Sequence, residues 1–99
     1  MEIEKQRERL TSPEVEERRD AVMRLAALRR PEASRAALAA LNDALPIVRA
    51  TAVGAVLWLP GEESARALIP LLNDKHEFVR QETAYALGRI GSRTAVAPL

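Results

Sequence analysis

A shift of 31 residues superimposes this chain on itself, and no other feature of the sequence limits the fold as strongly. Residues 42–68 then align with residues 73–99, and Asp43 falls on Asp74. A second shift of the same size brings residues 11–37 into the same frame. A fixed period of roughly 20 to 50 residues is typical of arrays in which similar units stack. We therefore predict three copies of one unit, the first of them degraded.

Each copy contains two stretches with the periodicity of a helix. In one such pair the apolar and small residues recur at spacings of three and four: Ala65, Leu68, Ile69 and Leu72 in the shorter stretch, and Val79, Thr83, Ala86, Leu87 and Ile90 in the longer one. Alternation of period two, which would indicate strands, is absent. Pro60-Gly61 and Gly91-Ser92 are expected to separate the helices. Because one helix pair cannot bury its own apolar side, the pairs must stack into an all-α solenoid.

The motif "ND" followed by "VRxxxAxAL", and above all "VRQETAYALGRIG" at residues 79–91, resembles the HEAT repeat in the short form of the phycocyanobilin-lyase-like group. This resemblance implies an α-solenoid, a right-handed superhelix of about three stacked helical hairpins plus a truncated further helix. It covers the chain as one domain. The implied units are about 2–30, 32–60 and 63–91, with a partial unit at 93–99.

The resemblance also assigns a structural role to paired charges. In that family an Asp in the turn within a repeat and an Arg six residues later form a hydrogen-bonded ladder between successive repeats. The matching pairs here are Asp43 with Arg49 and Asp74 with Arg80. Ser12 takes the place of the Asp that would precede Arg18, which leaves the first rung open.

A helical wheel of the longer helix in each unit leaves one arc outside the core, and the resemblance implies that these helices line a concave face. Aromatic side chains are typical of interface hot spots, and Gly54 allows a partner backbone to come close. For Trp58, packing at the junction between units stays open as the alternative, and for Phe78 packing at the helix start is preferred. The residues predicted to bind a protein or peptide are Trp58, Tyr85, Gly54, Thr51, Met23, Glu82 and Arg89.

The sequence offers few groups for catalysis. His76 is the single histidine and there is no cysteine, so neither a metal site nor a cofactor is expected. Deoxyhypusine hydroxylases, which also consist of HEAT repeats, carry iron-binding His-Glu pairs after "VR", where this chain has Arg19-Asp20, Ala50-Thr51 and Gln81-Glu82. We therefore predict a non-catalytic scaffold. An accessory subunit of a bilin lyase and a nucleic-acid-binding module remain the alternatives.

The charge balance bears on partners. Fifteen basic and fourteen acidic residues are interspersed along the chain, so no basic field for nucleic acid is expected. No apolar run is long enough for a membrane span, and we expect a cytoplasmic protein. A second candidate interface is end-to-end self-association through Val96 and Leu99. These residues belong to the predicted final helix and are expected to have no following layer to cover them.

Overall fold

A computed structural model describes residues 1–94 of the chain, with side chains described for residues 1–91. It consists of α1 (Glu2–Arg9), α2 (Val15–Leu28), α3 (Pro31–Ala37), the 3-10 helix η1 (Leu38–Asn42), α4 (Pro46–Ala55), α5 (Gly61–Leu68), the 3-10 helix η2 (Ile69–Asn73) and α6 (Glu77–Thr94). These residues contain no strand. The prediction of an all-α solenoid is confirmed.

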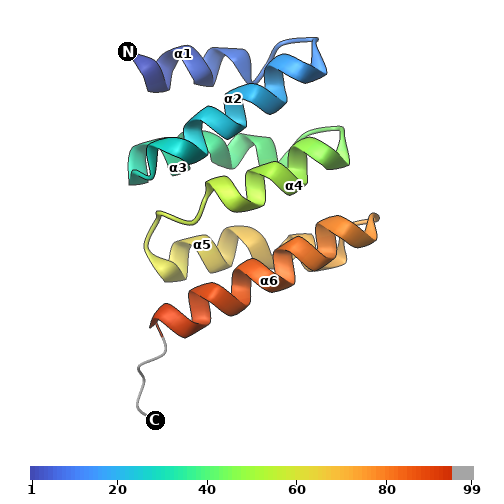
Figure 1. The fold of residues 1–99 in the computed structure, drawn as a ribbon. Helices are drawn as coiled ribbons and strands as arrows, with labels where there is room; N and C mark the ends of the chain where they lie inside the picture. The colour runs from blue at the N-terminus through green and yellow to red at the C-terminus, as the bar shows by residue number, and fades with distance from the viewer. Residues whose placement is uncertain (95–99) are drawn as a thin grey trace.

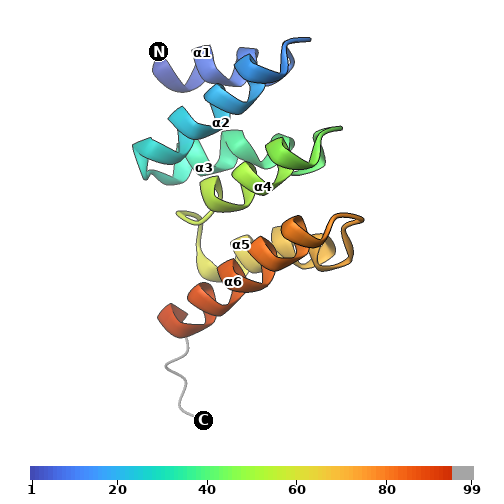
Figure 2. The same cartoon turned by 45° about the vertical axis from the view of Figure 1, so that its right-hand side comes forward.

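The helices form three successive layers. The first layer holds α1 and α2, the second α3, η1 and α4, and the third α5, η2 and α6. Figures 1 and 2 show α2, α4 and α6 following one another along one side of the stack, with α1, α3 and α5 along the other. One apolar core runs through all three layers, and its fully buried members include Val22, Leu25, Val48, Val53, Val56, Leu68 and Val79.

The turns before α2, α4 and α6 share one local structure. In each, a short polar side chain accepts a hydrogen bond from the backbone N–H two residues later, which imitates a backbone turn and fixes the entry into the helix. The three bonds are Glu14 N to Ser12 Oγ at 3.0 Å, Leu45 N to Asp43 Oδ1 at 2.9 Å and His76 N to Asp74 Oδ1 at 3.0 Å.

On the other side of the stack, α3 and α5 each pass from α-helix into 3-10 helix. α3 passes into η1 at Leu38, and α5 passes into η2 at Ile69. Pro70 lies at the start of η2, where its missing N–H breaks the α-helical pattern. The counterpart of Pro70 in η1 is Ala39, so the change does not require proline. It is a property of the shared unit.

The predicted helix break at Gly91-Ser92 is wrong, because α6 continues to Thr94. Its counterpart α4 ends at Ala55, ahead of Pro60. Proline disfavours helical backbone at the residue before it, whereas glycine keeps its N–H and costs only about 1 kcal/mol relative to alanine. Residues 95–99, which include Val96, Leu99 and most of the predicted unit 93–99, lie outside the described residues.

Candidate functional site

Met23, Gly54 and Tyr85 occupy the same position in successive units, 31 residues apart, and therefore form a row across α2, α4 and α6. Met23 is 49% exposed and Tyr85 67% exposed. Apart from its chain neighbours and the backbone of its own helix, a Cβ atom added at Gly54 would meet no atom within 4 Å. The row thus places two large exposed side chains on either side of an uncovered stretch of helix backbone.

A second apolar pair lies at the start of α4 and α6. Ile47 and Phe78 are counterparts, and both are exposed, at 42% and 43%. The Phe78 ring tilts against His76 with 5.8 Å between ring centroids, and it remains open to solvent, in contrast to the packing preferred for it from the sequence. Four exposed apolar side chains therefore lie on the side of the stack formed by α2, α4 and α6.

The polar residues predicted for this surface surround the row. Glu82 is exposed, and Thr51 is half-buried with its hydroxyl donating to the Ile47 carbonyl at 2.8 Å. Arg89 lies one turn after Tyr85, with its guanidinium carbon 5.9 Å from the centroid of the tyrosine ring. This distance is within the range of a cation–π contact, which favours one orientation of the exposed Tyr85 ring.

Trp58 is placed differently from the prediction. α4 ends at Ala55, so Trp58 lies in the turn beyond the helix, and its assignment to the helical arc is wrong. The side chain is half-buried against the apolar core. The guanidinium carbon of Arg29 lies 6.0 Å from the centroid of the indole. Arg29 has φ 51°, in the left-handed region, and ends α2. Trp58 therefore contacts the junction between the first and second layers.

A buried serine explains why α4 stops early. Ser34 Oγ donates to the Ala55 carbonyl at 2.8 Å and accepts from the Trp58 N–H at 3.1 Å. In a continuous helix these two backbone groups would bond with residues four positions away. The counterpart of Ser34 in α5 is Ala65, and α6 continues without interruption. This role was not predicted from the sequence, although a serine within an alanine-rich helix ahead of Pro60 was a usable signal.

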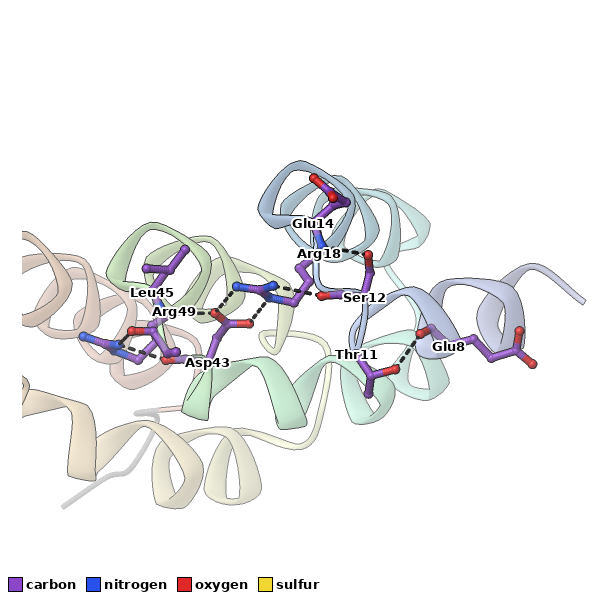
Figure 3. Close-up of polar contacts among 9 residues, drawn as sticks. Glu8, Thr11, Ser12, Glu14, Arg18, Asp43, Leu45 and Arg49 are labelled. Carbon is purple, nitrogen blue, oxygen red and sulfur yellow. Dashed lines mark hydrogen bonds and ion pairs between the residues drawn. The ribbon is translucent and has the colours of Figure 1, made fainter.

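The charged ladder links each layer to the next, with the arginine in the earlier layer and the carboxylate in the later one. Figure 3 shows the rung formed by Arg18 and Asp43. Arg18 Nη1 donates to the Ser12 carbonyl of its own turn at 2.8 Å. Its Nε and Nη2 donate to the Asp43 carboxylate of the next layer at 2.8 and 3.3 Å. Ser12 therefore leaves this rung intact, because the carboxylate that serves Arg18 comes from the following layer.

The second rung repeats this geometry. Arg49 Nη1 donates to the Asp43 carbonyl at 2.9 Å, while Nε and Nη2 donate to Asp74 at 2.8 and 3.0 Å. The hydrogen bonds from Arg49 lower the pKa of Asp74, against the opposing effect of burial, and the bond to Asp74 raises the pKa of Arg49. The side chains of Arg49 and Asp74 are only 13% and 9% exposed. This rung is a largely buried ion pair.

A separate network of polar side chains joins α1 and α2 within the first layer. Asp20 accepts from Arg24 at 2.7 Å and from Arg9 at 2.8 Å, and these two hydrogen bonds lower the pKa of Asp20. Arg9 also donates to Gln6, which is 1% exposed in the middle of α1. No role was predicted for Gln6, because a glutamine on a mostly charged helix gives no signal of burial.

The described residues offer little for chemistry. They contain no group of three or more histidine, cysteine, aspartate and glutamate side chains that could hold a metal ion. His76 is exposed and its ring contacts Phe78. Among the described helices, none combines the length and apolar character needed to cross a membrane.

Comparison with known families identifies the repeat. Residues 35–99, about two thirds of the chain, match the family model described as HEAT repeats. The match does not separate the phycocyanobilin-lyase-like form from other HEAT repeats. Comparison with curated proteins gives no match.

Proposed function

Because the chain belongs to the HEAT-repeat family, we propose that it is a non-catalytic scaffold that binds a protein or peptide on the side formed by α2, α4 and α6. HEAT repeats are commonly protein-interaction scaffolds. The observation that carries the proposal is the row of Met23, Gly54 and Tyr85, in which large exposed side chains flank a bare backbone. The cysteine-free sequence suits the reducing cytoplasm, where we propose that the scaffold works.

The row suits an apolar segment of a partner. A side chain of the partner fits over Gly54, between the flexible thioether of Met23 and the ring of Tyr85. Ile47 and Phe78 extend the apolar contact, while the exposed charges of Glu82 and Arg89 supply a polar rim. In this arrangement Tyr85 is the expected hot spot, because tyrosine is enriched among the residues that dominate binding energy.

Trp58 and Thr51 take secondary parts in the proposal. Both are half-buried, and Trp58 packs on the core and against Arg29. We assign Trp58 to support of the α4 end, with a partner contact at the border of the surface. Removal of its indole should therefore affect folding more than binding.

A library of displayed random peptides, selected on the immobilised chain, tests this surface without knowledge of the natural partner. Peptides selected on the wild type should bind Tyr85→Ala at least about tenfold more weakly, as expected for a hot spot. Ile69→Ala is the matched control, because Ile69 is a similarly exposed apolar residue of η2, on the other side of the stack. Peptides that tolerate Tyr85→Ala but lose affinity for Ile69→Ala would refute the proposed surface.

A further inference from the structure

Arg19 is a partly buried arginine of α2 that pairs with none of the described side chains. Its Nε is buried and donates to no acceptor, the one case of a buried side-chain nitrogen or oxygen without a partner among them. Neither Nη group has a partner there either, and both escape the burial of Nε, so they reach solvent. The other arginines of α2 are paired, Arg18 with Asp43 and Arg24 with Asp20. Arg19 therefore holds donors that no contact within the described layers uses.

The place of Arg19 in the repeat directs it to the proposed binding surface. It lies one helical turn before Met23, so the two residues share a face of α2. Its counterpart in the middle layer is Ala50, one turn before Gly54. Ala50 has a layer on each side of it and is still partly exposed. This position of the repeat therefore stays open to a partner within the stack itself.

The surroundings of Arg19 select the chemistry of its ligand. The donors of a guanidinium match a carboxylate through two parallel hydrogen bonds. Packing around Nε already restricts this side chain, so binding costs less rotamer freedom than it would for a freely moving arginine. Glu16 and Asp20 lie next to Arg19 along α2, and their negative charges repel an anion. A singly charged carboxylate is therefore favoured over a doubly charged phosphate.

We propose that the partner segment on this surface carries an aspartate or glutamate whose carboxylate accepts hydrogen bonds from Arg19. This inference rests on the function proposed above and specifies the partner, which needs an acidic residue close to the apolar one over Gly54. Arg19 precedes the level of Gly54 by about 6 Å along the helix, and neighbouring helices pack about 10 Å apart. The acidic residue should lie about two to four residues from the apolar one, because an extended chain advances about 3.3 Å per residue.

Peptides selected from the displayed random library on the wild type, then synthesised with amidated C termini, test the contact. They should be enriched in aspartate or glutamate at the expected distance from the apolar residue. Arg19→Gln removes the guanidinium and should weaken their binding by at least about tenfold. Replacement of the acidic residue of the peptide by its amide should weaken binding to the wild type to the same extent. The two changes together should cost no more than either alone, because both remove the same contact.

Arg24→Gln is the matched control, since it makes the same change of charge in the same helix at an arginine that Asp20 already pairs. It should leave peptide affinity unchanged. Circular dichroism checks that each variant retains its helices, and the amide-substituted peptide tests the contact without any change in the protein.

The inference is overturned if the selected peptides show no acidic enrichment, if the amide-substituted peptide binds the wild type as tightly as its parent, or if a folded Arg19→Gln chain binds the peptides as the wild type does. If Tyr85→Ala still weakens those peptides, the proposed surface stands without the contact to Arg19. If neither variant weakens them, the proposed surface fails as well.

Discussion

Arg49 and Asp74 join the second and third layers through two parallel hydrogen bonds of 2.8 and 3.0 Å, and both side chains are largely buried. The same guanidinium donates to the Asp43 carbonyl at 2.9 Å, so it also holds the turn of its own layer. Charge-assisted bonds with this paired geometry are stronger than single neutral ones. The ladder should therefore contribute more to the stability of the stack than the exposed ion pairs do.

Removal of the Asp74 charge tests the ladder. Asp74→Asn keeps the size of the side chain and an oxygen that can accept the His76 N–H, but it removes the charge that Arg49 faces. We expect the free energy of unfolding in urea to fall by about 2 kcal/mol. Asp20→Asn is the control, because Asp20 is 42% exposed and pairs with Arg9 and Arg24 within the first layer. Equal losses in the two variants would mean that burial of the rung adds nothing.

Acid should weaken the fold through the same carboxylate. Arg49 lowers the pKa of Asp74 in the folded chain, whereas the unfolded chain titrates near the ordinary value of about 3.9. The stabilisation is therefore fully present above the ordinary pKa and is lost as the pH falls through the lowered pKa of the folded state. Unfolding measured from neutral pH into acid should show the wild type and Asp74→Asn converging below about pH 4. A constant gap between them would contradict this linkage.

Ser34 should stabilise the early end of α4. Ser34→Ala removes the partner of both the Ala55 carbonyl and the Trp58 N–H in a buried place, which should cost about 1 to 3 kcal/mol of unfolding free energy. The emission of Trp58 should shift as well, because its backbone is no longer held. Thr11→Ala is the control, since the Thr11 hydroxyl makes an exposed bond to the Glu8 carbonyl. If both changes leave stability within about 0.5 kcal/mol, Ser34 has no such role.

Substitution of Trp58 should mainly lower stability, whereas substitution of Tyr85 should mainly weaken peptide binding. Trp58→Ala is expected to lower the unfolding free energy by about 2 kcal/mol or more, because it empties a partly buried site against the core. Tyr85→Ala should change stability by about 0.5 kcal/mol or less, since the ring is 67% exposed. Thermal unfolding of the two variants measures this difference. A stable Trp58→Ala chain that loses its selected peptides would instead make Trp58 the principal anchor.

The repeat, the layers and the direction of the chain follow from the sequence, because helical periodicity and a fixed 31-residue offset are local properties. The ends of the helices do not. Nothing local to Trp58 indicates that the Ser34 hydroxyl, 24 residues away in the chain, takes its N–H and helps to stop α4. The direction of the ladder was also hidden, since the family resemblance pairs Asp43 with Arg49, whereas the Asp43 carboxylate bonds to Arg18. Such contacts between layers depend on packing, which a single sequence does not display.

The substitution Gly54→Ala adds one methyl group and tests both the stability of the fold and the proposed binding surface. Within a helix and with open space around its Cβ position, Gly54→Ala should raise the unfolding free energy by about 0.5 to 1 kcal/mol. The same methyl group should weaken the selected peptides, because it fills the gap between Met23 and Tyr85. Gly88→Ala is the matched control, since Gly88 also lies in a helix with open space but outside the row. It should stabilise the chain to a similar extent and leave peptide affinity unchanged. If Gly54→Ala stabilises the fold and peptides still bind as they do to the wild type, no partner approaches the backbone at Gly54, and the binding surface must lie elsewhere on the stack.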